Sequence, residues 1–565
     1  MADTQEELAI KVRELQKEVE RLNAQLKEKR FGLTWIDVPE AFEKESESSI
    51  PVLEEVPELA IHNDDGKPTH ILIEGDNFHT LTCLNYTHRG KIDVIYIDPP
   101  YNTGNDEFVY RDERFLEEYP NGTPIPKNHP LRHSAWVSFI VKRLKLAYEL
   151  LSDRGVMFIS IDDNEQANLK LICDDLFGRN NFLAQIIWER AYAPVNLKKH
   201  FSESHDYILA YAKQIDKAEN NGLPRTEEAN ERYSNPDNDP RGVWKAADCS
   251  VGPVIEEKVY EIELPSGRKV LPSRGRCWVY TRERFLEMVS DNRIWFGNEG
   301  NSVPAVKKFL SEVKQGITPM TIWKYGEIGH SQDATKELKE IFGGKALFTY
   351  PKSVRLIERI IQLYSKNDSI VLDFFAGSGT TMHATMQLNE EDNGNRQCIL
   401  CQLNEADICK NVTYERNRRV INGYRNSRNE DVAGLGNSLK YYRTAFVGKN
   451  QPKAATDDDK LTLAKKAGCL LGLAENTLYE TEATDFYQFY TDEHGRWTCI
   501  YFQEDYSRFE EFREKVVSLE GEGKSVYVFC WTDGAEFATE FEYEKNVTVK
   551  SIPQPILDIY KSLNA

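Results

Sequence analysis

Short apolar strands alternate with helical segments along most of this chain, and this alternation constrains the fold more than any other feature. Ile92–Ile97 and Gly155–Ile161 are apolar runs of strand length, and apolar residues recur at helical spacing across His133–Ser152 between them. Strands separated by helices of roughly 10–20 residues indicate a mainly parallel sheet. The sequence therefore predicts an α/β fold.

The alternation stops near residue 213 and returns near residue 349. The intervening stretch begins rich in Asn, Asp, Glu and Pro and continues as an irregular, aromatic and locally basic segment. Beyond it, the strand Ser369–Asp373 leads into a Gly-rich turn, a helix follows, and Gln397–Gln402 reads as the next strand. One α/β domain thus appears in two halves with a long insertion between them.

This pattern divides the chain into seven expected segments. They are an N-terminal helix (1–30), an acidic linker (31–68), the first half of the α/β domain (69–213), the insertion (214–335), the second half (336–429), a second linker (430–460) and a C-terminal α+β domain (461–565). Valines at a and leucines at d of a heptad seam, from Leu8 to Leu26, favour two-stranded parallel pairing of the first helix. The alternative is a single amphipathic helix packed on its own body.

Charge and composition limit the classes of protein to which the chain can belong. Its 71 basic and 91 acidic residues give a net charge of −20, which argues against a general nucleic-acid coat protein but not against a nucleic-acid enzyme with a local basic cluster. No apolar run is long enough to span a membrane, and the acidic N-terminus is not a secretory signal. Ten scattered cysteines are typical of reduced thiols, so we expect a cytoplasmic location.

The first motif that carries chemistry is Asp98-Pro99-Pro100-Tyr101, directly after the apolar strand that ends at Ile97. Tandem prolines cannot continue a central strand, so the chain must turn out at the carboxyl end of this strand. Open α/β sheets place their active sites at that edge. A carboxylate, a free carbonyl and an aromatic face suit a flat, amino-bearing ring, although an ordinary strand–turn with a buried carboxylate is the alternative.

The second motif is the strand–turn–helix sequence from Asp373 through Phe375, Gly377 and Gly379 to Thr381. Its glycines permit close approach of the backbone to a ligand, and the following helix presents free amides at its N-terminus. No lysine follows Gly379, so it is not a phosphate-binding P-loop, and it lacks the third glycine of a dinucleotide fingerprint. It is typical of a nucleotide-type cofactor site.

Together the two motifs resemble DNA amino-methyltransferases that use S-adenosylmethionine. Their order, with Asp-Pro-Pro-Tyr first and the insertion between them, resembles the β class, whose target-recognition domain lies in this gap. The likeness is strongest to the modification subunit of type III restriction–modification systems, and it includes the stretches Asn235–Gly242, Arg293–Gly297 and Lys307–Val313. It implies a circularly permuted, Rossmann-like methyltransferase sheet interrupted by a target-recognition insertion.

The resemblance also implies roles for individual residues. The expected catalytic residues are Asp98, Pro99, Pro100 and Tyr101. The expected S-adenosylmethionine-binding residues are Asp76, Asn77, Lys352, Ser353, Asp373, Phe374, Phe375, Ala376, Gly377, Ser378, Gly379, Thr380 and Gln402. Ser353 stands where many relatives have a second proline. Most methyltransferases place an acid for the ribose hydroxyls where this chain has Gln402, and Glu405 is the other candidate for that contact.

A metal site and cysteine chemistry are not expected. Cys398 and Cys401 have the spacing of metal ligands, but they lie inside an apolar strand without a second pair or a histidine partner, so we predict core packing and no metal. The chain contains no Pro-Cys pair, which carbon-5 cytosine methyltransferases use to present their nucleophile. The chemistry therefore points to an exocyclic nitrogen, and the resemblance implies methyl transfer to N6 of a flipped-out adenine. N4 of cytosine is the alternative, although relatives of that kind usually carry Ser in place of Asp98.

Double-stranded DNA is the expected substrate, and the insertion is the expected place of its recognition. The segment Arg268–Arg293 contains seven basic residues and only three acidic ones, with aromatic residues interleaved. This composition favours phosphate contact and base readout over a merely solvated loop. The candidate DNA contacts are Arg268, Lys269, Arg274, Arg276, Arg282 and Arg284. A catalytically silent specificity subunit is a further alternative.

The resemblance also implies that the protein is a homodimer. It further implies a separate restriction subunit as partner, because the chain itself has no helicase or nuclease motif. Two candidate dimer interfaces follow from the sequence. One is the N-terminal heptad seam, and the other is a C-terminal hairpin, Phe486–Phe502, which is aromatic on both faces and needs a further element to cover it.

Overall fold

The structure is a computed structural model that describes residues 33–40, 49–104, 112–194, 199–225, 227–313, 316–531 and 535–563. The predicted N-terminal helix (1–30) lies outside the described residues. The chain forms two compact units, one of Met1–Glu219 with Thr321–Ala565 and one of Asn220–Met320. The smaller unit lies within the expected insertion (214–335), and each unit is described by itself below.

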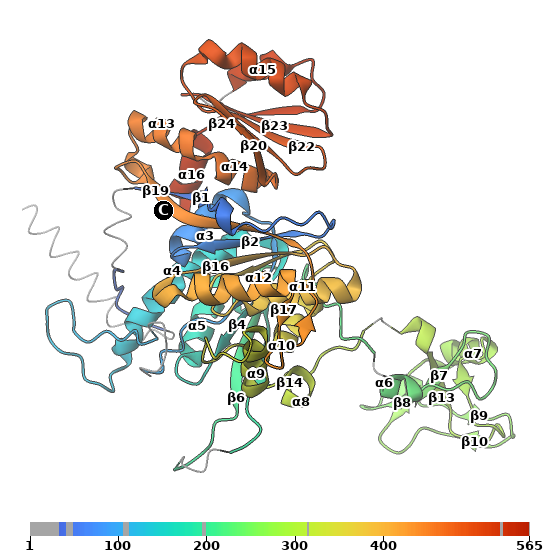
Figure 1. The fold of residues 1–565 in the computed structure, drawn as a ribbon. Helices are drawn as coiled ribbons and strands as arrows, with labels where there is room; N and C mark the ends of the chain where they lie inside the picture. The colour runs from blue at the N-terminus through green and yellow to red at the C-terminus, as the bar shows by residue number, and fades with distance from the viewer. Residues whose placement is uncertain are drawn as a thin grey trace, which may run out of the picture. The chain divides into compact units, whose positions relative to one another are not determined.

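A ten-stranded mixed sheet forms the core of the larger unit (Figure 1). Only β1 and β6 run opposite to the other strands of this sheet, so the predicted α/β class is confirmed. In spatial order the strands are β1 (Ile50–Glu55), β19 (Ser438–Val447), β2 (Thr69–Glu74), β16 (Gln397–Gln402), β15 (Ile370–Asp373), β3 (Ile92–Ile97), β4 (Leu151–Ile161), β6 (His205–Ala212), β5 (Phe182–Glu189) and β14 (Ile322–Trp323).

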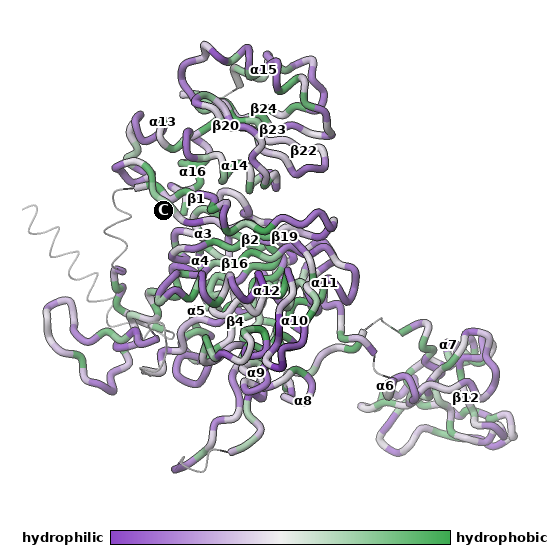
Figure 2. The backbone as a smooth tube through the Cα atoms, in the orientation of Figure 1, coloured by the Kyte–Doolittle hydropathy of each residue, from purple (hydrophilic) through white to green (hydrophobic). Residues whose placement is uncertain are grey.

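Helices cover both faces of this sheet. Because side chains alternate along a strand, Ile71 and Ile73 of β2 join one apolar cluster and Leu72 joins another. Figure 2 shows hydrophobic residues concentrated along the strands of the sheet. The helices of this part are α3 (Asn77–Thr87), α4 (Ser134–Leu150), α5 (Gln166–Phe177), α8 (Tyr325–Ile328), α9 (Ser331–Ile341), α10 (Val354–Tyr364), α11 (Thr380–Asp392) and α12 (Glu415–Asn422), followed by the short ladder β17 (Tyr424–Arg425) and β18 (Asp431–Val432).

Both expected linkers contribute a strand to the main sheet, which the sequence analysis did not predict. β1 lies in the segment 31–68 and β19 in the segment 430–460, and the two pair antiparallel from Ile50↔Val447 to Glu55↔Tyr442. β19 also pairs in parallel with β2. The side chains of Ile50, Val52 and Leu53 are fully buried. Acidic residues around β1 hide this short apolar run in the sequence, and only its long-range partner makes it a strand.

The C-terminal part of the larger unit is a second α/β layer. Its five-stranded sheet runs in the order β20 (Tyr479–Ala483), β21 (Tyr487–Thr491), β22 (Arg496–Tyr501), β23 (Gly523–Phe529) and β24 (Val547–Ile552). Four helices accompany it, α13 (Asp457–Lys466), α14 (Gly468–Glu475), α15 (Phe509–Ser518) and α16 (Gln554–Leu563).

The aromatic hairpin of β21 and β22 is covered within this same chain. Phe489 and Tyr501 pack against α15 in one cluster, whereas Tyr490 and Ile500 join the main cluster together with residues of α14 and α16. The sequence left open whether a further element or a partner covers this hairpin, and helices of the same chain bury both of its faces. Among the described residues, no helix is long and apolar enough to cross a membrane.

The smaller unit is built on short strands and one well-formed helix. Its three-stranded antiparallel sheet has the order β12 (Ile294–Trp295), β13 (Ala305–Phe309) and β7 (Trp244–Asp248). The other elements are α6 (Glu227–Glu231), α7 (Arg282–Ser290), the ladder β8 (Ser250–Val251) with β11 (Cys277–Trp278), and the ladder β9 (Ile262–Glu263) with β10 (Lys269–Val270). Trp278, Phe285, Met288 and Ile294 form part of its apolar core.

Candidate active site

The carboxyl ends of four neighbouring parallel strands, β2, β16, β15 and β3, meet at one edge of the main sheet. Asp373 ends β15, and Asp98 directly follows the adjacent strand β3. A cavity at this edge is lined by residues that follow all four strands, including Asp76, Asp98, Asp373 and Gln402. Open α/β sheets bind ligands at the carboxyl ends of such strands. The topology therefore brings the two predicted motifs to one site.

Asp98 presents a carboxylate oxygen to this cavity. Its Oδ1 lies 3.1 Å from the Nζ of Lys352 in an ion pair that lacks good hydrogen-bond geometry, and no other described residue forms a hydrogen bond with this oxygen. Burial raises the pKa of Asp98, and the nearby Lys352 ammonium opposes this rise. A buried carboxylate oxygen whose hydrogen-bonding capacity is only partly used is costly, so this oxygen is suited to accept an N–H from a ligand.

The loop after Asp98 is held rigid by two buried side chains. The carbonyl of Pro100 accepts a 2.7 Å hydrogen bond from the indole of Trp136. The carboxylate of Asp112 accepts the backbone N–H groups of Tyr101 at 2.9 Å and of Thr103 at 2.7 Å. It also accepts that of Asn102, a residue in the left-handed conformation at φ 60°. Asp112 thus fixes the turn that aims the catalytic motif.

The Gly-rich turn after β15 is organised by Asp373. One of its oxygens accepts the backbone N–H of Phe375 at 3.0 Å, and the other accepts the hydroxyl of Thr381 at 2.6 Å. Burial raises the pKa of Asp373 to about 7, although both hydrogen bonds oppose the rise. Gly379 has φ 76°, and a Cβ there would collide with Asn417 Nδ2. Only glycine fits this position, where α11 begins.

The end of β16 is tied to the same turn. Gln402 accepts the backbone N–H of Gly377 at 2.7 Å through Oε1, and its Nε2 donates to the carbonyl of Leu403 at 3.0 Å. Both ends of this amide are therefore engaged within the protein. Glu405 also lines the cavity, and its side chain is exposed. Of the two ribose candidates, Glu405 is the one with oxygens available to a ligand.

A buried arginine supports the β2 side of the cavity. Arg143 of α4 is fully buried, and it donates to Asn77 Oδ1 while its Nη2 lies 3.3 Å from Asp76 Oδ2. Asp76 caps α3 by accepting the N–H of Phe78 at 2.8 Å. The guanidinium of Arg143 also stacks 3.8 Å from the ring of Phe139, another cavity residue. A charged residue inside the apolar pattern of α4 is the sequence signal that could have identified it.

The six basic residues predicted to contact DNA are all exposed on the smaller unit. Arg284 pairs with Glu287 at 2.7 Å and Lys269 with Glu261 at 2.9 Å, whereas no ion pair joins Arg274 or Arg282 to another described residue. The interleaved aromatics have a different role from the one expected. Trp278 and Phe285 are 1% and 2% exposed and belong to the core, so they cannot read bases.

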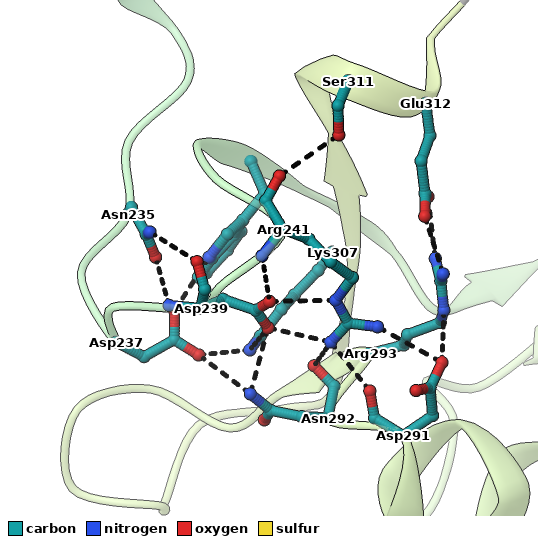
Figure 3. A network of polar contacts seen from close by, with 11 residues as sticks. Asn235, Asp237, Asp239, Arg241, Asp291, Asn292, Arg293, Lys307, Ser311 and Glu312 are labelled. Carbon is teal, nitrogen blue, oxygen red and sulfur yellow. Dashed lines mark hydrogen bonds and ion pairs between the residues drawn. The ribbon is translucent and has the colours of Figure 1, made fainter.

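All three stretches that carry the resemblance inside the insertion meet in one polar network (Figure 3). The buried ammonium of Lys307 pairs with Asp237 and lies 3.2 Å from Asp239. Asp239 pairs in turn with Arg241 at 2.9 Å, and Arg293 pairs with Glu312 at 2.7 Å. A buried charge left without its partner is strongly destabilising. These charges therefore hold the smaller unit together rather than serve as free DNA contacts.

A family model described as DNA methylase matches residues 92–412 of the chain, including both motifs and the insertion. The chain belongs to this DNA methylase family.

Curated relatives agree with this membership. The chain is 34% identical to the Mod subunit of the type III restriction-modification enzyme StyLTI of Salmonella typhimurium, over 74% of this chain and 66% of that protein. It is 32% identical to the type II methyltransferase M.KpnI of Klebsiella pneumoniae, over 66% of this chain and 90% of that protein. The chain is also 30% identical to the Mod subunit of the type III restriction-modification enzyme EcoP15I of Escherichia coli, over 60% of this chain. The match spans 58% of that protein, which is less than two thirds of its length.

Among solved structures, PvuII DNA methyltransferase (cytosine-N4-specific) is similar to this chain at 12% identity and a TM-score of 0.29, over 60% of this chain and 86% of its own.

Most residues that the sequence assigned to catalysis or cofactor binding line the cavity of this DNA methylase. They are Asp98 and Pro100 with Asp76, Asn77, Lys352, Asp373, Phe374, Phe375, Ala376, Gly377, Ser378, Thr380 and Gln402. Pro99, Tyr101, Ser353 and Gly379 are not among the lining residues. Gly379 shapes the turn, and the Tyr101 hydroxyl accepts a hydrogen bond from Lys352.

Ser353 differs most from its predicted role in this methylase. Its buried hydroxyl donates to the carbonyl of Ile328 at 2.6 Å, so it braces the start of α10 instead of facing a ligand. Arg114, Phe139 and Phe348 line the cavity without having been predicted, because they lie outside both motifs. Cys398 and Cys401 are buried in two different apolar clusters, which is the packing expected from their strand.

Proposed function

We propose that this DNA methylase transfers a methyl group from S-adenosylmethionine to N6 of an adenine flipped out of duplex DNA. We propose further that it is the modification and specificity subunit of a type III restriction–modification system. The observation that carries the reaction is the Asp98 carboxylate, which lines the cavity of the Gly-rich turn and whose Oδ1 forms an ion pair with Lys352 but no hydrogen bond of good geometry with any described residue. The type III Mod relatives support the biological setting.

The cavity suits S-adenosylmethionine. The turn at Gly377 lets backbone approach a ligand, Phe375 and Phe139 supply apolar surface, and Glu405 offers a carboxylate for the ribose hydroxyls. Asp76 is the expected acceptor for the adenine end. When bound, this cofactor supplies an electrophilic methyl group on a sulfonium.

The residues of the protein orient and stabilise the attacking amine. The lone pair of an exocyclic amine is delocalised into its ring, so the amine is a poor nucleophile. By accepting its N–H groups, Asp98 and the Pro99 carbonyl would aim the lone pair and stabilise the positive charge that develops on nitrogen. Flipping the base costs a few kcal/mol, which stacking on Tyr101 would partly offset.

Adenine is favoured over cytosine because the motif begins with Asp98, whereas N4-cytosine enzymes usually carry Ser there. To test this, DNA methylated by the protein is digested to nucleosides and analysed by mass spectrometry. We expect N6-methyladenine, and N4-methylcytosine alone would contradict the adenine assignment.

A catalytically silent specificity subunit is the second candidate, and it makes a different prediction. Transfer of labelled methyl groups to DNA is measured for the wild type and for Asp98→Ala. We expect transfer by the wild type only, with DNA and cofactor binding retained in the variant. A wild-type protein that labels no DNA would favour the silent subunit.

The recognition sequence and the partners are also open to direct test. Mapping modified adenines across a genome with and without the protein should reveal a short asymmetric site methylated on one strand, as expected for a type III enzyme. Scattered methylation without a motif would contradict a recognition role for residues 214–335.

We also propose a cytoplasmic homodimer that works with a separate restriction subunit. Removing residues 1–30 should loosen the dimer in light scattering, and a fully active monomer would refute this model.

A further inference from the structure

Lys352 occupies a position that its assignment to cofactor binding does not explain. Its Nζ lies 3.1 Å from Asp98 Oδ1 and 3.5 Å from Asp206 Oδ2, so two carboxylates share one ammonium. The same Nζ donates a 2.7 Å hydrogen bond to the hydroxyl of Tyr101. Lys352 therefore contacts two residues of the Asp-Pro-Pro-Tyr motif directly.

The position of this ammonium is confined from several sides. It lies 4.9 Å from the ring centre of Tyr101 and 5.3 Å from that of Trp188, which is itself 1% exposed. The backbone carbonyl of Lys352 accepts the Thr380 hydroxyl at 3.4 Å. The hydrogen bond from the adjacent Ser353 hydroxyl to Ile328 holds the next residue. A long side chain held between aromatic faces loses little further freedom when it acts on Asp98.

Asp206 anchors the far side of this arrangement. It lies on β6, is 4% exposed, and its other oxygen lies 2.6 Å from Arg190 Nε. Neither Asp206 nor Arg190 belongs to a motif of the sequence analysis. A buried carboxylate requires compensation, and Arg190 with Lys352 provides it.

The ammonium occupies the face of Asp98 that a substrate amine needs. An amine can donate to Asp98 Oδ1 only if the Lys352 ammonium moves away from this oxygen. The ammonium must then keep the bonds to its other two partners. Tyr101 and Asp206 supply such partners, so the ammonium can leave Asp98 without becoming a buried, unpaired charge.

We infer that Lys352 is a positioning residue for the methyl-transfer site, and that Asp206 retains its ammonium when the target amine binds to Asp98. The inference rests on the proposed function. Before the amine binds, Lys352 keeps Asp98 ionised and oriented. After binding, Asp206 prevents the ammonium from competing with the amine for the same oxygen.

The charges around Asp98 predict opposite effects of removing Lys352 and Asp206. Burial raises the pKa of Asp98 and Asp206 adds to this rise, whereas Lys352 and the hydrogen bond with Tyr101 oppose it. The other ionisable groups among the residues lining the cavity are left unchanged by both variants, and they are Asp76, Tyr96, Arg114, Tyr350, Asp373 and Glu405. Since Asp98 must be ionised to accept the amine, its pKa sets the acid limb of the rate–pH profile.

The experiment compares Lys352→Met and Asp206→Asn in single-turnover methylation from pH 5 to 9. Both variants should lose roughly tenfold or more of the plateau rate. The acid limb should move to higher pH in Lys352→Met, because the buried carboxyl loses its cation. In Asp206→Asn it should move to lower pH, because the ammonium then pairs with Asp98 alone. Each shift should be about one pH unit.

Controls separate this role from structural and cofactor effects. Lys217→Met and Asp153→Asn make the same changes in an exposed pair 2.6 Å apart, and they should leave the profile unchanged. Lys352→Arg and Asp206→Glu keep the charges, so in each of these variants the acid limb of the rate–pH profile should lie closer to that of the wild type. Calorimetry should give an S-adenosylmethionine affinity for Lys352→Met within about twofold of the wild type, about 0.4 kcal/mol.

Other outcomes identify which idea fails. If the acid limbs of the rate–pH profiles of Lys352→Met and Asp206→Asn move in the same direction, or do not move, the inference is overturned while the proposed function stays intact. A tenfold or greater loss of cofactor affinity in Lys352→Met would overturn it in favour of cofactor binding. A wild-type protein that methylates no DNA would overturn the proposed function, and the inference with it.

Discussion

Gln402 accepts the backbone N–H of Gly377 at 2.7 Å, so the side chain at the end of β16 braces the Gly-rich turn. Its amide nitrogen is engaged by the carbonyl of Leu403. The position where most methyltransferases have a ribose-binding acid is thus used for internal structure in this chain. The exposed carboxylate of Glu405, on the same cavity, is the group left for such a ligand.

Glu405→Gln should therefore weaken S-adenosylmethionine binding. A hydrogen bond to a charged group contributes about 1.5–3 kcal/mol, so the dissociation constant should rise about tenfold or more. Isothermal titration calorimetry measures this directly. Glu390→Gln, in an exposed ion pair with Lys67, is the matched control and should have no effect. An unchanged affinity in Glu405→Gln would return the ribose contact to Gln402.

Asp112→Ala should impair catalysis without preventing cofactor binding. The change removes the acceptor from three backbone N–H groups of the loop after Asp98, and unsatisfied buried groups cost about 1–3 kcal/mol each. We expect a methylation rate lower by about 10–100-fold, since misplaced catalytic groups lose rate steeply. Rapid-quench kinetics with saturating cofactor measures it. Near-normal kinetics would show that the loop holds its shape without this carboxylate.

The raised pKa of Asp373 predicts a specific pH dependence of stability. Its folded pKa of about 7 lies above the unfolded value, so the fold binds this proton more tightly than the unfolded chain. The resulting stabilisation is full below about pH 4 and is lost as the pH rises toward 7. Between pH 5 and pH 8, the melting temperature of the wild type should therefore fall by more than that of Asp373→Asn. The exposed Asp368→Asn is the control, and a pH-independent difference between wild type and Asp373→Asn would contradict the assignment.

Of the six predicted DNA contacts, Arg274 and Arg282 are the best candidates for phosphate contact, because neither an ion pair nor a hydrogen bond engages their guanidinium groups among the described residues, whereas Arg268 donates to the carbonyl of Asn301. The double variant Arg274→Ala/Arg282→Ala should weaken binding to all DNA sequences alike. The slope of log affinity against log salt should become shallower by roughly one to two. Fluorescence anisotropy over a salt series measures both quantities. Arg428→Ala, outside the insertion, should change neither, and an unaltered slope in the double variant would exclude these phosphate contacts.

The α/β class, both chemical motifs and the position of the insertion could be predicted from the sequence because each depends on local pattern. Tandem prolines after an apolar strand force the chain out of the sheet at Asp98 wherever that strand lies. Glycine at 379 is required by a backbone conformation that the turn itself imposes. Helical and strand periodicities report which side chains face a core, and the strands β3, β4, β15 and β16 follow from them.

Tertiary structure decided the features that depend on distant partners. β1 and β19 are strands because they pair with each other, and β19 also pairs with β2, whereas neither predicted linker carries enough local pattern to show it. Trp278 and Phe285 became core residues of the insertion because folding buries large apolar surfaces regardless of neighbouring charges. Lys352 reaches Asp98 and Asp206 only through the packing of separate elements. Spacing along the chain cannot encode these contacts, because they depend on how the sheet orders its strands.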